Sequence, residues 1–184
     1  ALDLFKKMEA LAENTEVVDP PGKLELQAFA NDSYAYYYYR RGKCNAALSY
    51  ANRAMKVHHH RGAWAHVAVA HLHTSAILSR LQRNPEAMKC LAQVLVLVDA
   101  GKLEVGGASP QKLSMIAVAF HNLAVEQLLM GHVSEAAVAA QNARRLARLC
   151  LSYSNRWLKR FEGTHELALA KLKQAGEEKK SSRH

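Results

Sequence analysis

The sequence contains few of the residues that break or cross-link a chain. Of its 184 residues, nine are glycine, four are proline and three are cysteine. So little glycine and proline argues against a β-sandwich with many turns and against a low-complexity linker. Three widely spaced cysteines are not a disulfide framework, so we expect a reducing compartment, the cytoplasm.

Long uncharged stretches are also missing. The longest segment without Asp, Glu, Lys or Arg is 62–79, which falls short of the roughly 20 apolar residues that a membrane-spanning helix needs. We therefore expect no transmembrane segment. The chain begins with Ala and has no signal-peptide pattern, so we expect it to be a piece of a longer protein. Apolar residues still make up 49% of the chain, enough for a packed core.

Motifs for catalysis, phosphate binding and metal binding are absent as well. The sequence has no Gly-x-Ser-x-Gly, no glycine-rich phosphate loop and no His-Glu-x-x-His. The run His58–His60 cannot present three rings to one ion, because successive helical residues point about 100° apart. Cys44, Cys90 and Cys150 lack the spacing of zinc ligands. We expect no enzyme activity, no catalytic residues, no metal and no cofactor.

Helical periodicity dominates the rest of the chain. Met88, Leu91, Leu95 and Val98, for example, recur at spacings of three and four residues. Such patterns predict about eight helices, at 1–13, 24–41, 43–59, 63–82, 84–99, 110–130, 132–151 and 154–178. A break at 19–22 and a loop at 99–110 interrupt them. Most other connections are short, so neighbouring helices should form antiparallel hairpins in an all-α fold.

Three of the predicted hairpins share a pattern of small residues around their turns. The turns contain Gly42, Gln82 and Gly131, and the alanine five positions later is Ala47, Ala87 or Ala136. A second small or branched residue follows seven positions after each alanine: Ala54, Val94 and Ala143. Small side chains let two helices approach closely, and a repeated unit of this kind buries its apolar face by stacking on its neighbours.

This pattern resembles the tetratricopeptide repeat (TPR) family over about residues 28–150. The third unit matches the family's large and small signature positions with Phe120, Leu123, Ala124, Gly131, Ala136 and Ala143. The segments 70–87 and 119–136 are also similar to TPR arrays of large protist multi-repeat proteins. The signature alanines are 40 and 49 residues apart, whereas the family repeats about every 34 residues. The repeats are therefore degenerate.

The resemblance implies a TPR-like α-solenoid of antiparallel helix hairpins with flanking N-terminal and C-terminal capping helices. Residues 24–152 would form the repeat domain, with hairpins at about 28–59, 64–98 and 112–150. Outside it we expect an N-terminal helix and linker at 1–23, a capping helix at 153–178 and a polar tail at 179–184. The apolar face of the cap would consist of Tyr153, Trp157, Phe161, Ala168 and Leu172.

The first helix of each TPR hairpin lines a concave groove, so the resemblance also implies a binding site. The corresponding partner-binding residues are Asp32, Tyr36, Tyr39, Arg40, His73, Arg80, His121 and Asn122. Tyrosine and arginine contribute strongly to binding at protein interfaces, and the groove suits a peptide with apolar anchors and acidic residues. His73 and His121 would make binding sensitive to pH between about 5 and 8.

Positive charge concentrates near the C-terminal end. Residues 139–184 contain 11 Lys and Arg against four Asp and Glu, which gives 11 − 4 = +7 of the net +9. The predicted basic patch consists of Arg144, Arg145, Arg148, Arg156, Lys159 and Arg160. Such a patch could meet an acidic protein tail, nucleic acid or an anionic membrane surface. No recognised nucleic-acid motif accompanies it.

Three functional hypotheses follow. The leading one is a non-catalytic protein–protein interaction or scaffolding module that takes a partner segment in the groove. The second is a basic helical-repeat module that binds RNA or another polyanion. The third is a self-associating structural segment of a larger cytoskeletal assembly, which would make the chain a homo-oligomer associated with the cytoskeleton.

Overall fold

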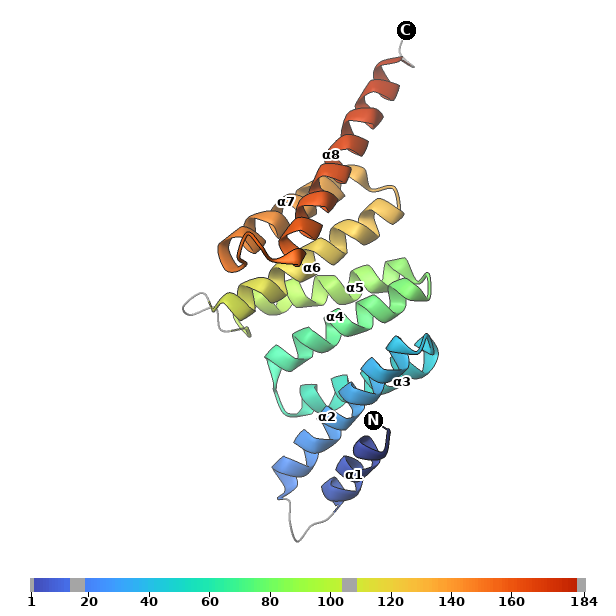
Figure 1. Cartoon of the computed structure of the whole chain (residues 1–184), viewed down its shortest axis with the longest axis vertical. Helices are drawn as coiled ribbons and strands as arrows, with labels where there is room; N and C mark the ends of the chain where they lie inside the picture. Colours follow the sequence, from blue (N-terminus) through green and yellow to red (C-terminus); the bar gives the residue numbers. More distant parts are fainter. Residues whose placement is uncertain (1, 14–18, 104–108, 182–184) are drawn as a thin grey trace. The chain divides into compact units, whose positions relative to one another are not determined.

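The computed structural model describes residues 2–13, 19–103 and 109–181, and all of its regular structure is α-helical. The helices in these ranges are α1 (Leu2–Glu13), α2 (Pro20–Arg40), α3 (Cys44–His60), α4 (Trp64–Arg80), α5 (Asn84–Asp99), α6 (Pro110–Leu129), α7 (Val133–Cys150) and α8 (Arg156–Ser181). The chain divides inside α5 into an N-terminal unit, Ala1–Cys90, and a C-terminal unit, Leu91–His184. Within each unit, consecutive helices pack as antiparallel pairs (Figure 1). The predicted all-α class is confirmed.

The start of α2 differs most from the predicted boundaries. We expected residues 19–22 to break the chain and the helix to begin at 24, but α2 begins at Pro20. The side chain of Asp19 accepts a hydrogen bond from the Gly22 N–H at 3.0 Å. Pro20 and Pro21 occupy the first helical positions, where no intrahelical N–H bond is lost, so these residues start the helix. Parts of the predicted linker, loop and tail, at 14–18, 104–108 and 182–184, lie outside the described residues. The predicted end of the last helix at 178 is wrong, because α8 continues to Ser181, into the predicted tail.

Helices α2 to α6 all end in the same backbone turn. One residue at each end has a positive φ: Gly42, Gly62, Gln82, Gly101 and Gly131. The next residue donates its N–H to the carbonyl five positions back, as from Lys43 to Tyr38 at 2.9 Å and from Arg83 to Leu78 at 3.0 Å. This is the Schellman arrangement, which favours glycine because a Cβ strains the left-handed backbone. Gln82, at φ 59°, takes the position that glycine occupies in the other turns.

The alanines shared by the predicted repeats lie in helix interfaces. Ala47, Ala87 and Ala136 are all 0% exposed. Ala47 packs with Ala35 of α2 and Ile77 of α4 in the N-terminal unit. The absence of atoms beyond Cβ lets these helices approach closely, which is the packing that the sequence pattern requires.

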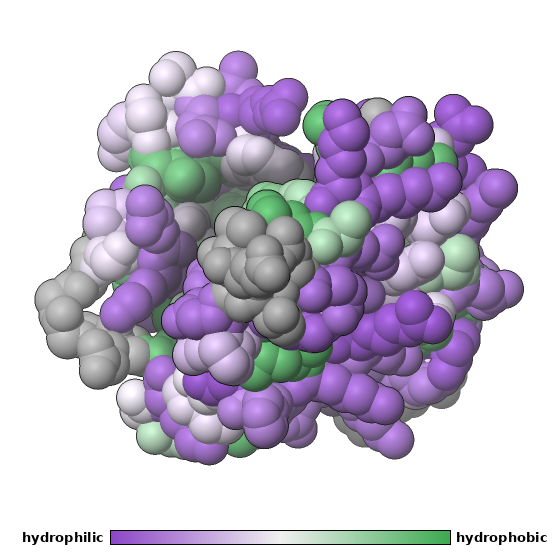
Figure 2. Space-filling model, turned by 90° about the horizontal axis from the view of Figure 1, so that it is seen from below, coloured by the Kyte–Doolittle hydropathy of each residue, from purple (hydrophilic) through white to green (hydrophobic). Residues whose placement is uncertain are grey.

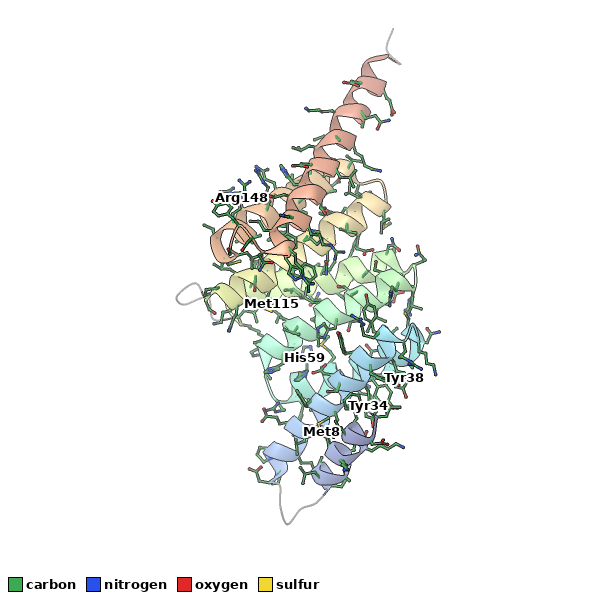
Figure 3. The ribbon with its side chains drawn as sticks, viewed as in Figure 1. Met8, Tyr34, Tyr38, His59, Met115 and Arg148 are labelled. Carbon is green, nitrogen blue, oxygen red and sulfur yellow. The ribbon has the colours of Figure 1, made fainter. Side chains whose placement is uncertain are left out.

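An aromatic cluster joins α1, α2 and α3. Tyr34 is buried and stacks on Tyr50, with ring centroids 4.7 Å apart, while Phe5 meets it edge-on at 5.0 Å. The Tyr34 hydroxyl also donates to Glu9 Oε2 at 3.0 Å. Figure 3 marks Tyr34 and Tyr38 one turn apart on α2, and Tyr38 stacks on Tyr50 as well. Tyr34 therefore lies in the core, and the partly buried Tyr38 packs against it.

In the C-terminal unit, α8 packs against α6 and α7 through a stripe of buried residues. Leu158 and Phe161 join Ala117 and Ala147 in one core cluster, and Ala168 lies in a second cluster with Ala124. Beyond Ala168, α8 extends past the α6–α7 pair (Figure 1). The helix therefore covers its neighbours with its N-terminal half only.

The predicted apolar face of α8 is wrong in three of its five members. Tyr153 is 85% exposed, Trp157 42% and Leu172 40%. Tyr153 precedes the helix, which starts at Arg156 rather than 154, and the inward side of the first turn carries Leu158 instead of Trp157. Leu172 lies in the part of α8 that extends past its neighbours.

The face in Figure 2 carries hydrophilic side chains over most of its area, with apolar side chains in small separate patches. In the described part of the chain, no helix is both long and apolar enough to span a bilayer.

Candidate functional site

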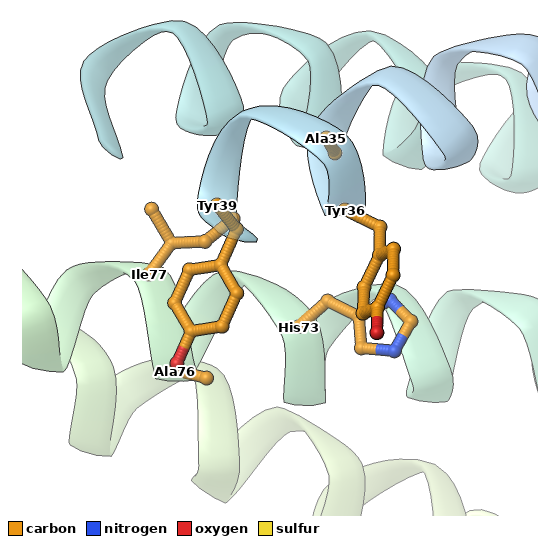
Figure 4. A pocket seen from close by; sticks show the side chains of 6 residues that line it. All are labelled: Ala35, Tyr36, Tyr39, His73, Ala76 and Ile77. Carbon is orange, nitrogen blue, oxygen red and sulfur yellow. The ribbon is translucent and has the colours of Figure 1, made fainter. Parts of the chain in front are cut away.

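A pocket lies between α2 and α4 in the N-terminal unit. It has a volume of about 120 Å³ and is lined by Ala35, Tyr36, Tyr39, His73, Ala76 and Ile77. In Figure 4, Tyr36 and His73 border one end of the pocket, and Tyr39, Ala76 and Ile77 border the other. The pocket therefore brings together three of the predicted groove residues: Tyr36, Tyr39 and His73.

Arg80 fixes one wall of this pocket. Its guanidinium lies 4.6 Å from the centroid of the Tyr39 ring, and the same group donates to the Tyr39 carbonyl at 2.9 Å. Both contacts join the C-terminal end of α4 to that of α2. The cation–π contact helps to hold the ring in place. Arg40, in the last turn of α2, is exposed.

Asp32 lies one helical turn before Tyr36 and is engaged by α3. Its Oδ2 accepts a hydrogen bond from His58 Nε2 at 2.8 Å. His58 is buried, and its ring stacks on that of His66 with centroids 5.1 Å apart. The carboxylate that we assigned to the groove is thus partly used inside the fold, although its side chain stays 30% exposed.

His73 lies at the exposed edge of the pocket. Displacement of water by neighbouring residues lowers its pKa below the usual value, and the negative charge of Asp32 opposes this effect. An uncharged imidazole can both donate and accept a hydrogen bond. At the edge of an apolar pocket it can orient the backbone or a polar side chain of a bound peptide.

The remaining two predicted groove residues lie on α6 in the C-terminal unit. Asn122 is half-buried, but His121 is 2% exposed and its ring packs against Phe161 at 4.5 Å. Burial, with a smaller effect from Arg160, lowers the pKa of His121 to about 4. The expectation that His121 contacts a partner and titrates between pH 5 and 8 is therefore wrong, because α8 covers that side of α6.

The predicted basic residues lie on the last two turns of α7 and the first turns of α8. Arg148, marked in Figure 3, donates to Glu162 at 2.6 Å, and the Arg160 guanidinium lies 5.4 Å from the Trp157 ring centroid. Arg145, Arg156 and Lys159 are exposed. These side chains form a cationic surface on one hairpin.

Sequence reasoning missed the aliphatic part of the pocket. Ala76 and Ile77 follow His73 by three and four residues, so they share its helix face. That spacing indicates a shared helix face, but the predicted partner-binding residues include only polar and aromatic side chains. Within 2–13, 19–103 and 109–181, no three His, Cys, Asp or Glu side chains are grouped in a way that could hold a metal ion.

Comparisons with known proteins add no relative. No protein-family model matches the chain, and no curated protein matches it significantly.

Proposed function

We propose that this chain is a non-catalytic protein-interaction module of the TPR type, and that the α2–α4 pocket anchors an apolar side chain of a partner peptide. The carrying observation is the pocket itself. It combines an apolar floor, Ala35 and Ile77, with three side chains suited to recognition: Tyr36, Tyr39 and His73.

The size of the pocket fits one side chain. A cavity of roughly 150 Å³ takes up a benzene ring, and this pocket measures about 120 Å³. Tyr36 is 60% exposed beside it, so its ring can close over an inserted group. Tyrosine is common among interface residues that carry much of the binding energy, because it offers a large contact area at low entropic cost.

The position of the pocket agrees with the TPR interpretation. Helices α2 and α4 are the first helices of the first two predicted hairpins, and these helices line the concave face in the family that the sequence resembles. The buried alanines and the shared Schellman turns also fit a repeated hairpin unit. Arg40 and Arg80, both exposed, favour a peptide that carries an acidic residue next to its apolar anchor.

Peptide selection on the purified chain tests this proposal. Peptides from a random display library would be selected on the wild-type protein, and their affinities measured by fluorescence polarisation. We expect Tyr36→Ala and the pocket-filling variant Ala76→Phe to weaken binding by more than about tenfold, as removal of an interface anchor does. Tyr153→Ala, at an exposed tyrosine in the other unit, is the matched control and should bind normally.

A selection that yields no binder contradicts the proposal. So does a set of peptides that bind Tyr36→Ala and Ala76→Phe as tightly as wild type. Circular dichroism of each variant separates loss of binding from loss of folding. Tyr36→Ala combined with Arg40→Ala, compared with Tyr36→Ala alone, would show whether Arg40 adds to the affinity.

A further inference from the structure

The end of the α7–α8 hairpin exposes apolar side chains among cations. Leu149, in the last turn of α7, is 74% exposed, Tyr153 in the connection is 85% exposed, and Trp157 in the first turn of α8 is 42% exposed. We call residues 144–160 the hairpin tip. This segment contains six Lys and Arg and no Asp or Glu. Three exposed apolar residues within nine positions of the chain, at the junction of two packed helices, are typical of an interaction surface.

The connection holds these side chains outward in an ordered way. The Asn155 N–H donates to the Ser152 carbonyl at 2.9 Å, and the Trp157 N–H donates to Asn155 Oδ1 at 2.9 Å. Leu151 packs beneath them in the cluster that contains Leu158. Tyr153 is therefore exposed on a turn that is held by its own hydrogen bonds and by the packing of Leu151 against the core.

Cations lie close to these apolar residues along the chain. Arg148 and Arg160 have contacts within the hairpin, to Glu162 and to the Trp157 ring. Arg145 lies one helical turn before Leu149, and Arg156 directly precedes Trp157; both are exposed. A surface of this composition, with Trp, Tyr and Leu between Arg and Lys, matches the boundary between lipid headgroups and acyl chains.

We infer that the hairpin tip binds the surface of an anionic lipid bilayer. Leu149, Tyr153 and Trp157 enter the headgroup region, and the arginines bind lipid phosphates and attract the negative membrane surface. A polybasic surface near a bilayer gains affinity with each cation. Apolar insertion adds the second signal that stable peripheral binding needs. This site is in the C-terminal unit and does not depend on the peptide pocket.

Two observations favour a bilayer over other anionic partners. Nucleic acid would contact phosphates with cations and stack its bases on aromatic rings, but it offers no apolar environment to Leu149, which is 74% exposed. A folded protein partner would have to supply cavities for side chains that project from a turn. A bilayer interface accepts projecting side chains without a preformed cavity.

Vesicle binding tests the inference with the full chain. Vesicles of phosphatidylcholine alone and of an equimolar phosphatidylcholine–phosphatidylserine mixture would be sedimented with the protein. We expect binding to the mixed vesicles, with little to phosphatidylcholine alone. Arg145→Gln with Arg156→Gln should lower the partition coefficient by about fivefold for each cation removed. Leu149→Ser with Tyr153→Ser should lower it by about tenfold, through lost apolar insertion.

Matched controls lie in the same unit. Val138→Ser replaces an apolar residue on α7 that is 60% exposed, and Lys171→Gln with Lys173→Gln removes two exposed cations of α8. Both should bind like wild type. The chain has two tryptophans, so Trp64→Phe leaves Trp157 as the reporter. Its fluorescence should shift to shorter wavelength on the mixed vesicles.

Other outcomes overturn the inference. Equal binding to both vesicle types, or equal loss in the control variants, would show that the hairpin tip is not the site. Absence of vesicle binding would do the same. A single-stranded RNA oligomer and a polyglutamate peptide serve as competing probes. Binding to either one, unaffected by Leu149→Ser with Tyr153→Ser and without vesicle binding, would assign the tip to that polyanion.

Discussion

The Nε2 atom of His58 lies 2.8 Å from Oδ2 of Asp32, so an imidazole on α3 holds a carboxylate one turn away from Tyr36 on α2. His58 is 3% exposed. Its replacement by alanine removes a hydrogen bond to a charged group and leaves a cavity, so His58→Ala should lower the free energy of unfolding by about 2–4 kcal/mol.

Asp32→Asn is the matched variant for this pair. The amide oxygen can still accept from Nε2, so the expected loss is smaller, about 1 kcal/mol. Urea denaturation at neutral pH measures the loss of unfolding free energy in both variants. If His58→Ala unfolds at the same urea concentration as wild type, the contact does not stabilise the α2–α3 pair.

The left-handed residue at the end of α4 predicts a stabilising substitution. Gln82 has a φ of 59° where the other four turns use glycine. Gln82→Gly should raise the free energy of unfolding by about 0.5–1 kcal/mol, because relief of the Cβ strain outweighs the entropy of the added glycine. The transition midpoint in thermal or urea denaturation measures the change.

The reverse substitution serves as the control for Gln82. A Cβ at Gly131 would meet no atom of the described residues within 4 Å, so only backbone strain acts in Gly131→Gln, and a loss of about 1 kcal/mol is expected. Destabilisation by Gln82→Gly would mean that the glutamine side chain makes a stabilising contact.

The two aromatic residues of the α8 N-terminus should differ in importance. Phe161 is 1% exposed in the core that α8 shares with α6 and α7, so Phe161→Ala should cost about 3–5 kcal/mol. Trp157 is 42% exposed, and Trp157→Ala should cost only about 1–2 kcal/mol, part of it from the lost contact with Arg160. Equal losses in urea denaturation would contradict this packing of α8.

Burial of His121 predicts an acid-sensitive contribution to stability. Its pKa is lowered from 6.5 to about 4 in the folded chain. The contribution of the neutral His121 ring to the free energy of unfolding is fully present above pH 6.5, where the ring is neutral in both the folded and the unfolded chain. It is lost as the pH falls, because the unfolded chain then binds a proton that the folded chain does not. By pH 5 the loss should reach about 2 kcal/mol.

Denaturation of wild type and His121→Leu at pH 7.5 and pH 5 measures this contribution. The leucine variant should lose about 2 kcal/mol less than wild type between the two pH values. It should also be no less stable at pH 7.5, since His121 Nδ1 is buried and has no hydrogen-bond partner among the described residues. Identical pH dependence in both proteins would show that His121 does not titrate as described.

Local chemistry made the helices and turns readable from the sequence. Spacings of three and four apolar residues determined the helices, and the glycines at 42 and 131 marked helix ends because few other residues tolerate a positive φ there. The buried alanines were also predictable, because small residues at a repeated position favour close contact between helices. The start of α2 was misread because Asp-Pro-Pro-Gly can either break a chain or cap a helix.

The placement of the site residues depended on tertiary structure. Periodicity shows which residues share a helix face, but it does not show which face a distant segment covers. His121 was assigned to a groove from its position on α6, yet Phe161, 40 positions later in the chain, packs on its ring. Likewise, Ala76 and Ile77 became part of a pocket only when α4 packed beside α2. The sequence by itself determined the helices, their turns and their small-residue interfaces, whereas packing between distant segments decided which side chains remain available to a partner.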